Sequence, residues 1–493
     1  MAELIARWLG VDVTTTEMAV AVCDEDQQEG FASTKMCGAT HWHGDTAFPA
    51  FDLGRVPAML RELLETLANQ GWTFKEPGSL SVACRQHDMV LLDQDGRPLM
   101  PALSWQCNAA AEETKQLNAN SQVTDSVGPL EERFILPKLA HVLKRDASLR
   151  NQIASSMTTG DWILGSLSGC FRLSSSDALS NGLLNQETRQ LATAVLSLAE
   201  IPPEWFPDVI QSGHCVGTLN SQPAAGDWQE LRETLAGWQV VAGLGDNHAS
   251  ALGCGMTDER TLVVSAGTSG TINLARPANS ALNKVDLPAV RFEYYRQRSL
   301  LLRMLAHCGD WYNRFLAEFA GDFSDAHPLL NSLAAGSDLE HVVRVECDQN
   351  GEFYRPGWTR ASLACKVASV QYSIGLELLI HVSKMLAEVP NSRQQISRYV
   401  LTGGLSQAIF FQQVFRAGIE LLDPGKEVRV SGRTGPLRYK TSAYGALLNA
   451  RMPEFNHELA NIPSSLFPLA ECAAADTEKR DSLRRRLQAE FRW

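Results

Sequence analysis

The spacing of apolar and polar residues at the start of the chain is first typical of strands and then typical of a helix. Trp8 to Val22 contains two β-prone segments, WLGVDV and MAVAV, joined by the small hydroxyl residues of TTTE, which predicts a strand, a turn and a second strand. From Val56 to Leu67 the apolar residues follow helical spacing, and Asn69 to Gly71 supply a stop signal. The chain therefore opens as a β-hairpin followed by an amphipathic helix.

The second half of the chain repeats this opening design. Thr261 to Ala275, TLVVSAGTSGTINLA, combines an apolar strand, a turn of Gly, Thr and Ser, and a second apolar strand. A further predicted strand, 397–402, runs into Gly403 and Gly404, and predicted helices precede and follow it. Alternating strands and helices are typical of an α/β protein. Two such hairpins about half a chain apart indicate an internal duplication.

The duplication suggests where the domains divide. We expect a first domain at 1–238, a second at 239–452 and a tail at 453–493. The tail is predicted to end in a helix, because Leu483, Leu487 and Phe491 are four residues apart on one helical face. A chain of 493 residues is longer than one core usually fills, which agrees with at least two domains.

Composition and charge exclude several classes of protein. With 44% hydrophobic and 20% charged residues the chain can fill packed cores, so it is globular rather than disordered. Its formal charge of −12 opposes general binding to nucleic acid or to an anionic membrane. The chain has no uninterrupted apolar run of about 20 residues and no secretory signal at its start, so we expect neither a membrane span nor export. The 11 scattered cysteines lack a CxxC pair and indicate reduced thiols in a cytoplasm.

Both hairpin turns are candidate phosphate sites. Backbone amides in a tight turn, with Thr and Ser hydroxyls beside them, form a concave anion site that needs no net positive charge. In the first hairpin Asp12 ends a strand, where a carboxylate can hold Mg²⁺, and Thr15 offers its hydroxyl and amide. The second hairpin supplies Gly267, Thr268 and Ser269. Each turn alone is also explained as an ordinary hairpin; the matched pair is the stronger signal.

A third candidate is VVAGLGDNHASALG, residues 240–253. The pattern predicts a strand, a glycine turn and a helix that begins close to Asp246 and Asn247. Asp246 is either an N-cap or a general base that accepts a proton from a substrate hydroxyl. Gly243 and Gly245 beside it suggest that something approaches the backbone closely.

The ordered set of these motifs resembles the FGGY carbohydrate kinases and, within them, the xylulokinase-like branch. The resemblance covers roughly residues 5 to 450 and rests on the two hairpins, GDN and the paired glycines. Four further segments look like family segments: Val90 to Trp105, Ser174 to Leu184, Leu401 to Phe415 and Ser442 to Ala450.

The resemblance implies an α/β, two-domain, actin-like (ribonuclease-H-like) fold with a ligand cleft between the domains. Sugar would bind mainly to the first domain and ATP to the second. Asp246 would be the catalytic base and Asp12 the magnesium ligand. The implied substrate-binding residues are Arg85, His87, Trp105, Asp246 and Asn247. The implied ATP-binding residues are Thr14, Thr15, Gly267, Thr268, Ser269, Gly403, Gly404 and Gln407. The implied activity is ATP- and Mg²⁺-dependent phosphorylation of a ketose, polyol or sugar acid, and a homodimer is plausible.

The sequence departs from the family pattern where ligands are expected. Thr14 occupies a glycine position of the first turn, and a β-branched residue tolerates positive φ poorly, so either the turn differs or the phosphate sits farther off. Arg85 replaces a glutamine; it either favours an acidic sugar through a charge-assisted bond or pairs with Asp88. His87 could instead be a satisfied buried histidine, and Trp105 only wall packing. These departures leave a second hypothesis open: a catalytically weak sugar- or nucleotide-binding relative that acts as a sensor.

Overall fold

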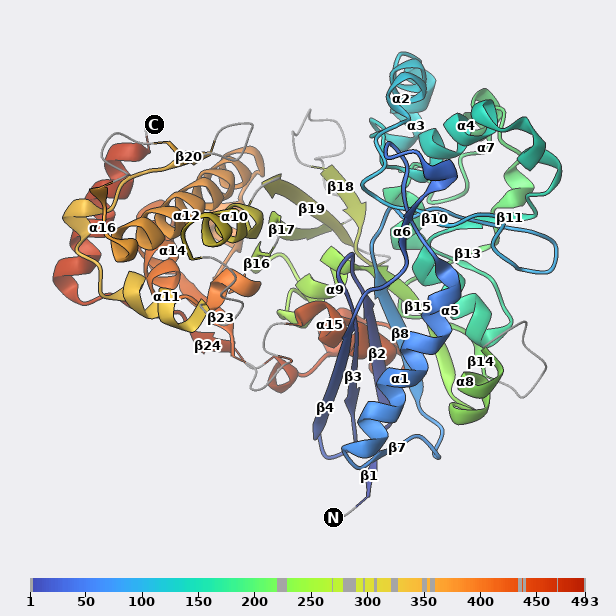
Figure 1. The fold of residues 1–493 in the computed structure, drawn as a ribbon, viewed down its shortest axis with the longest axis horizontal. Coiled ribbons are helices and arrows are strands. Elements are labelled where there is room, and N and C mark those ends of the chain that lie inside the picture. Colours follow the sequence, from blue (N-terminus) through green and yellow to red (C-terminus); the bar gives the residue numbers. More distant parts are fainter. Residues whose placement is uncertain are drawn as a thin grey trace. The chain divides into compact units, whose positions relative to one another are not determined.

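The chain is described by a computed structural model that covers most of its length. The described residues are 3–219, 228–267, 269–277, 290–295, 298–305, 308–320, 327–347, 353–354, 360–432, 437, 440–467 and 469–491. They divide into two compact units (Figure 1). Unit 1 comprises Met1–Gly253, Phe292–Ser299 and Ser442–Ile462, and unit 2 comprises Cys254–Arg291, Leu300–Thr441 and Pro463–Trp493.

Unit 1 is built around a six-stranded mixed sheet with the order β14-β15-β8-β2-β3-β4. Its strands are β14 (Cys215–Thr218), β15 (Gln239–Gly245), β8 (Ser79–Cys84), β2 (Trp8–Val13), β3 (Glu17–Cys23) and β4 (Glu29–Lys35). β2 and β3 form the predicted antiparallel hairpin, and β2, β8 and β15 run parallel. The predicted strand, turn and strand over Trp8 to Val22 are therefore confirmed.

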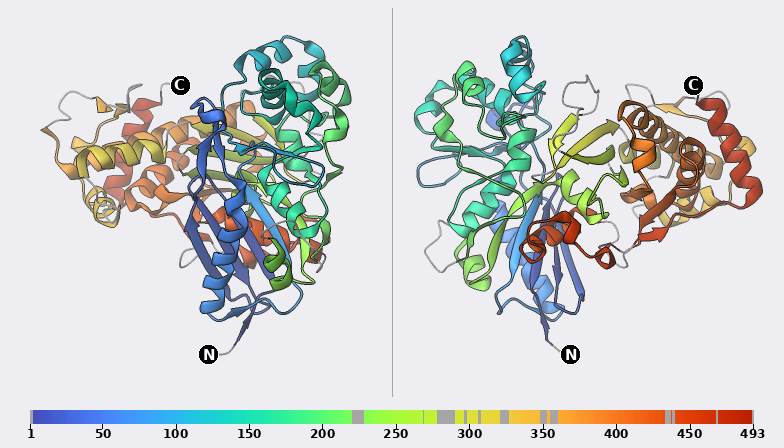
Figure 2. Two further views of the ribbon diagram at one scale, coloured as in Figure 1. Left: turned by 45° about the vertical axis from the view of Figure 1, so that its right-hand side comes forward. Right: turned by 180° about the vertical axis from the view of Figure 1, so that it is seen from behind.

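Unit 1 also holds helices and short strands. The helices are α1 (Val56–Asn69), α2 (Ala111–Asn118), α3 (Ser121–Val127), α4 (Ile135–Arg145), α5 (Thr159–Ser168), α6 (Ser175–Ser180), α7 (Thr193–Leu198), α8 (Gln229–Thr234), α9 (Asp246–Gly253) and α15 (Thr441–Ala450). Of these, α1, α5, α6 and α9 contact the sheet. The short strands are β1 (Leu4–Ile5), β5 (Ala39–His41), β6 (Pro49–Phe51), β7 (Trp72–Thr73), β9 (Val90–Leu92), β10 (Ala102–Leu103), β11 (Ser155–Met157), β12 (Leu173–Ser174) and β13 (Val209–Ile210). α1 packs its predicted apolar stripe against β3 and β4 (Figure 2), which confirms that helix.

Two elements belong to unit 1 although the sequence suggested a boundary at residue 238. β15 is an internal strand of the sheet, because it pairs with β8 on one side and β14 on the other. α15 comes from far along the chain and packs on unit 1 with almost no spacing. A Cβ at Gly445 would lie 1.7 Å from the carbonyl oxygen of Ala249, and one at Gly10 would lie 2.2 Å from the nitrogen of Leu447. Only glycine, which has no Cβ, permits this close backbone contact. The pairing of β15 and the packing of α15 therefore decide which residues belong to unit 1.

Unit 2 holds a seven-stranded sheet with the order β18-β19-β17-β16-β22-β23-β24. The strands are β18 (Val290–Glu293), β19 (Arg298–Leu305), β17 (Gly270–Pro277), β16 (Thr261–Ala266), β22 (Arg398–Thr402), β23 (Glu427–Ser431) and β24 (Leu469–Glu471), and β20 (Glu346–Cys347) pairs with β21 (Phe353–Tyr354). β16 and β17 form the second predicted hairpin, which is thereby confirmed. β16, β22 and β23 run parallel, as β2, β8 and β15 do in unit 1, so the two units share this arrangement.

The helices of unit 2 surround a large apolar core. They are α10 (Gly309–Ala320), α11 (His327–Ala335), α12 (Leu363–Glu388), α13 (Ser392–Gln395), α14 (Ile409–Leu422) and α16 (Thr477–Glu490). Among the described residues α12 alone is long and apolar enough to cross a membrane, with a mean hydropathy of 1.4 over 18 residues. Of that window 67% is buried against its own unit, so core packing explains its composition. The predicted terminal helix is present as α16, with Leu483 and Leu487 buried.

Candidate active site

The residues with candidate chemistry in unit 1 converge on one edge of its sheet. Asp12 lies near the carboxyl end of β2, Arg85 directly follows β8, and Asp246 directly follows β15. The strands are adjacent and in register, because Cys84 pairs with Val13 on one side and with Gly245 on the other. Ligands of open α/β sheets bind beyond the carboxyl ends of parallel strands. We call these three strand ends the carboxyl edge.

The turn of the first hairpin adopts a conformation that suits threonine. The Thr14 hydroxyl donates to the carbonyl of Glu17 at 3.0 Å and accepts the Glu17 amide at 3.1 Å. The Thr14 amide also donates to the Glu17 carbonyl, at 2.9 Å. Thr14 is not among the residues with positive φ, so the strain of positive φ is absent there. The turn thus avoids positive φ at Thr14, as one of the two alternatives allowed, because the Thr14 side chain itself closes it.

Asp12 is the candidate metal ligand of this edge. Its side chain is buried, and Ser442, at the start of α15, donates its hydroxyl to Asp12 Oδ2. No group of three or more His, Cys, Asp or Glu side chains arranged to hold a metal occurs within the described parts of the chain. Mg²⁺ needs few protein ligands, because it keeps several waters and binds substrate phosphates, and it prefers oxygen. A carboxylate beside hydroxyl groups therefore fits this ion.

Arg85 is held in place by its neighbours. Its Nη2 lies 2.6 Å from Asp88 Oδ2, its Nη1 donates to the Thr14 carbonyl at 3.1 Å, and its guanidinium lies over the ring of Phe51. Burial lowers the pKa of Arg85, but the charge of Asp88, its hydrogen bond and the charges of Cys84 and Asp246 together outweigh burial and raise the pKa. Of the two interpretations offered for Arg85, the structure has the pair with Asp88.

Trp105 closes a ring of contacts around Arg85. Its backbone N–H donates to Asp88 Oδ1 at 3.0 Å, and its indole N–H donates to the Thr15 hydroxyl at 3.0 Å. Thr15 follows Thr14, whose carbonyl accepts from Arg85. The ring therefore runs through the hairpin turn, Arg85, Asp88 and Trp105, and it ties a predicted phosphate turn to predicted sugar-binding residues. We call it the Asp88 ring.

His87 is buried beside this ring and is anchored from two sides. Its Nδ1 lies 3.2 Å from Asn181 Oδ1, and its ring stacks on Phe134 with centroids 4.9 Å apart. Burial, reinforced by the charge of Arg133, holds the pKa of His87 well below its usual range, so the imidazole is neutral. A neutral, fixed imidazole can bind a hydroxyl but carries no charge at physiological pH.

Gln86 points toward the neighbouring strand. Its amide Nε2 lies 2.8 Å from His248 Nδ1 and 3.3 Å from the Ser180 hydroxyl. A Cβ at Gly245 would lie 2.1 Å from Gln86 Cγ, which explains the second glycine before Asp246. Burial lowers the pKa of His248 to about 3. Gln86 thereby connects the loop after β8 to α9, which begins at Asp246.

Asp246 is the first residue of α9, and its Oδ1 accepts the backbone N–H of Asn247 at 2.8 Å. Loss of hydration raises the pKa of Asp246 to about 6, although the Asn247 amide and the charge of Arg85 act in the opposite direction. The side chains of Asp246 and Asn247 are both partly exposed at the carboxyl edge. A carboxyl group with this pKa is largely ionised at pH 7 and is basic enough to accept a proton.

Two supporting residues, Lys138 and Asn181, had not been singled out from the sequence. Lys138 is buried and donates to the carbonyl of His87 and, at 3.3 Å, to that of Ser104; burial lowers its pKa to about 8. Asn181 also accepts the N–H of Ile135 and donates to the Gln86 carbonyl. Asp88, which the sequence had offered as a partner of Arg85, centres the ring described above. Only Asn181 had a signal, because it lies in the segment Ser174 to Leu184 that resembles the family.

The nucleotide-side candidates in unit 2 also converge. Ser265 pairs with Thr402, so the turn after β16 and the glycines after β22 are neighbours at the ends of parallel strands. Gly403 has φ 88°, and a Cβ there would lie 2.5 Å from the carbonyl carbon of Ala266. Only glycine fits such a position. Gly404 and Gln407 bound the helical turn that follows. The structure describes Gly267 and Ser269 in the second turn; Thr268 lies outside the described residues.

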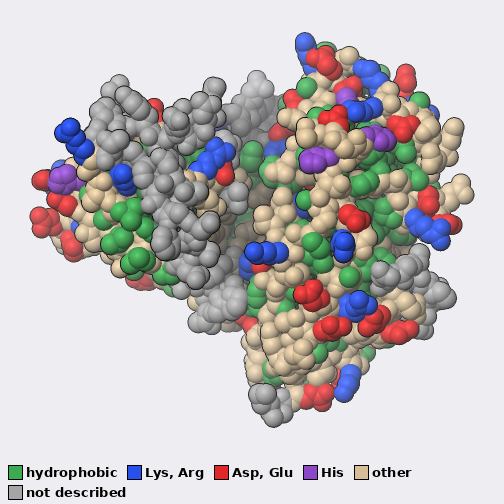
Figure 3. All heavy atoms as spheres, in the orientation of Figure 1, with side chains coloured by type: hydrophobic (Ala, Val, Ile, Leu, Met, Phe, Trp, Pro, Cys, Tyr) green, Lys and Arg blue, Asp and Glu red, His purple; other side chains and the backbone are tan. Residues whose placement is uncertain are grey.

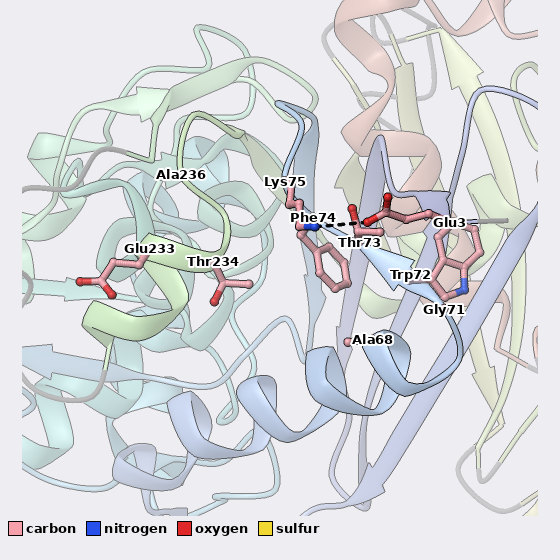
Figure 4. Close-up of a pocket in the computed structure, with 10 residues that line it drawn as sticks. All are labelled: Glu3, Ala68, Gly71, Trp72, Thr73, Phe74, Lys75, Glu233, Thr234 and Ala236. Carbon is pink, nitrogen blue, oxygen red and sulfur yellow. Dashed lines mark hydrogen bonds and ion pairs between the residues drawn. The ribbon is translucent and has the colours of Figure 1, made fainter. Parts of the chain in front are cut away.

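A cavity of about 640 Å³ opens at the other end of the unit 1 sheet (Figure 4). Its lining includes Trp72 and Phe74, ahead of β8, and Lys75, which forms an ion pair with Glu3 at 3.3 Å. None of the predicted site residues lines it. The face in Figure 3 intermixes acidic and basic side chains over unit 1.

Comparison with known proteins identifies the family. Residues 7–253 match the N-terminal domain of the FGGY family of carbohydrate kinases, which is half of the chain. The chain belongs to this family.

Relatives and solved structures agree with the xylulokinase-like branch. The chain is 28% identical to the xylulose kinase of Staphylococcus xylosus over 216 residues, which are 42% of this chain and 43% of that one. It is 25% identical to the xylulose kinase of Escherichia coli K12 over 267 residues, 53% of each. In these alignments the chain spans about half the length of the curated relatives.

The fold is matched over nearly the whole chain. The crystal structure of xylulose kinase from Rhodospirillum rubrum superposes with a TM-score of 0.77 at 19% identity, covering 98% of both chains. The predicted fold class, an actin-like, ribonuclease-H-like pair of α/β domains, is confirmed.

Proposed function

We propose that this protein transfers the γ-phosphoryl group of ATP to a hydroxyl of a small sugar, a ketose, polyol or sugar acid, with Asp246 as general base. The observation that carries the proposal is the convergence of Asp12, Arg85 and Asp246 at the ends of three adjacent parallel strands. Family membership supports the reaction class, and the pKa of Asp246 supports its role.

On the sugar side, the neutral imidazole of His87, the indole of Trp105 and the amide of Asn247 orient the substrate. The Asp246 carboxylate accepts the proton of the attacking hydroxyl at Oδ2, because Oδ1 already accepts the N–H of Asn247. Deprotonation by a positioned base contributes about 10²- to 10⁴-fold in rate. The remaining acceleration comes from positioning, because phosphoryl transfer needs little covalent help from the protein.

On the phosphate side, two hairpin turns provide backbone amides and hydroxyls. Thr14 and Thr15 belong to one turn, and Gly267 and Ser269 belong to the other; Thr268 is included in the proposal from the sequence. Gly403 and Gly404 let the backbone lie against the adenosine, with Gln407 beside it. Asp12 would hold Mg²⁺, which neutralises charge on the phosphates when bound.

The test is coupled ADP release with Mg·ATP against a panel of pentuloses, hexuloses, polyols and sugar acids. Asp246→Asn keeps the size of the side chain and removes the base, so we expect turnover to fall at least about 100-fold. Asp95→Asn, on an exposed turn of the same unit, is the matched control. Full activity of Asp246→Asn on the preferred sugar would overturn the assignment of the base.

Two further proposals concern the setting of the enzyme. We infer a cytoplasmic location, supported by ten cysteines described as free thiols, of which Cys37, Cys170 and Cys215 are exposed. A homodimer is proposed from the family resemblance. Light scattering at micromolar concentration measures the mass directly, and a monomer would contradict the dimer.

A further inference from the structure

The ion pair of Arg85 and Asp88 is enclosed by protein. The two side chains are 5% and 0% exposed, and their charged atoms lie 2.6 Å apart. Asp88 also accepts the Thr159 hydroxyl at 3.4 Å and the Trp105 amide at 3.0 Å. A buried pair of opposite charges is stable only while both partners remain, because either one alone is an uncompensated buried charge.

The pair lies among other charged groups at the carboxyl edge. Arg85 interacts electrostatically with Asp246, and Lys138 interacts with both members of the pair. Arg133 acts on Asp246 and on His87. With Asp88 in place, the charge of Arg85 is cancelled within the protein, and this charge is not offered to a ligand.

We propose that Asp88 is a specificity-determining residue that masks Arg85 and so makes the sugar site select neutral sugars over sugar acids. This inference rests on the proposed function and narrows its substrate class. Arg85, which from the sequence alone could favour an acidic sugar, takes the opposite role because its carboxylate partner is supplied by the chain itself.

A sugar carboxylate and Asp88 would compete for a single cation, the guanidinium of Arg85. A sugar carboxylate at this edge would have to displace Asp88 from Arg85, or else lie near the negative charges of Asp88 and Asp246. The first course costs free energy because it leaves the buried charge of Asp88 without its partner, and the second because it brings like charges together. A sugar hydroxyl requires neither.

Removing the negative charge of Asp88 should reverse the preference for neutral sugars over sugar acids. In Asp88→Asn the amide oxygen can still accept the Trp105 N–H, whereas the negative charge is lost. The guanidinium is then uncompensated, and a ligand carboxylate would supply the missing charge. We expect affinity for a sugar acid to rise about tenfold relative to the matching polyol, since hydrogen bonds between charged groups are the stronger ones.

The experiment measures binding without ATP by calorimetry, using D-glucitol with D-gluconate and D-arabinitol with D-arabinonate as matched probes. The variants are Asp88→Asn, Arg85→Gln with Asp88→Asn, and Thr159→Val, which removes the other side-chain donor to Asp88 and leaves the ion pair. We expect the wild type and Thr159→Val to prefer the polyols, Asp88→Asn to gain the acids, and the double variant to lose that gain. Thermal unfolding verifies that each variant is folded.

Two results would overturn the inference: a wild type that prefers the acids, or a folded Asp88→Asn without gained acid binding. If Asp88→Asn does not fold, the double variant decides. Like the wild-type ion pair it has no net charge at positions 85 and 88, so its ratio of acid to polyol affinity should stay within about threefold of the wild-type ratio. A larger change contradicts the proposal. ADP release separates this outcome from failure of the proposed function. A wild type that phosphorylates no sugar refutes the function, whereas neutral-sugar turnover with no effect of Asp88→Asn refutes only the mask.

Discussion

The indole N–H of Trp105 donates to the hydroxyl of Thr15 across 3.0 Å, joining residues that are 90 positions apart in the chain. Trp105 belongs to the sugar-side segment, and Thr15 is in the turn that is expected to meet phosphate. The same tryptophan is fixed through its backbone by Asp88. Binding on the sugar side is therefore mechanically connected to the phosphate turn through the Asp88 ring.

The first prediction concerns this hydrogen bond. Trp105→Phe removes the donor and keeps an aromatic wall, and Thr15→Val removes the acceptor at similar size. Each change should raise the KM for ATP, and the two effects should be non-additive by about 1 kcal/mol, the net value of such a bond. A double-mutant cycle on kcat/KM for ATP measures this coupling, and strictly additive effects would show that the bond does not couple the two sides.

A second prediction concerns pH. Because the pKa of Asp246 is about 6, the carboxylate is available above that value, and kcat/KM should fall as pH drops through 6. Arg85 favours the ionised carboxylate, so its removal raises the pKa of Asp246. The acidic limb of the profile of Arg85→Gln should therefore lie at higher pH than in the wild type. An acidic limb that stays in place or moves to lower pH would contradict this electrostatic link.

A third prediction separates steric contact from backbone strain at the nucleotide-side turn. Gly403 and Gly425 have similar φ values, 88° and 83°, but only at Gly403 would a Cβ meet the neighbouring strand, 2.5 Å from Ala266. Both alanine variants bear the strain of positive φ, about 1 kcal/mol. Gly403→Ala must also displace the turn after β16, so its KM for ATP should rise about tenfold or more above that of Gly425→Ala. Equal KM values would remove Gly403 from the nucleotide site.

Local patterns in the sequence predicted the parts of the fold that depend on neighbours in the chain. The two hairpins, α1, α12 and α16 follow from the periodicity of apolar residues, and their turn and cap residues are close in sequence. Asp246 was identifiable because two glycines and a helix start flank it. The sequence placed Arg85 in the candidate site, but it left open whether Arg85 binds an acidic sugar or pairs with Asp88.

Long-range contacts account for what the sequence did not reveal. Lys138 acts through carbonyl groups of a loop about 50 residues away, and β15 joins unit 1 by pairing with a strand far earlier in the chain. Thr14 shows the reverse case: its hydroxyl satisfies the turn locally, so the substitution that motivated the sensor hypothesis introduces no backbone strain.

The last prediction concerns a buried pair of carboxyl groups, Asp161 on α5 and Asp177 on α6. Asp161 Oδ1 accepts the Ser174 amide at 3.1 Å, and Asp177 Oδ2 accepts the Thr158 hydroxyl at 3.4 Å; Asp161 Oδ2 and Asp177 Oδ1 have no hydrogen-bond partner within the described structure. Burial raises the pKa of Asp161 to about 7, and burial together with the charge of Asp161 raises the pKa of Asp177.

The sign of the pH dependence follows from these shifts. An unfolded aspartate ionises near pH 4, whereas Asp161 in the folded protein stays protonated up to about 7, so the folded state binds more protons in this window and stability falls as pH rises from about 4 to 7. Asp161→Asn keeps an acceptor for the Ser174 amide and cannot ionise. Its free energy of unfolding should exceed that of the wild type at pH 8 by a few kcal/mol, while the advantage should be clearly smaller at pH 5 and disappear below about pH 4. Urea unfolding at both pH values, with the exposed Asp95→Asn as control, measures this difference, and a variant equally destabilised at both would show that the pair is held by something other than a proton.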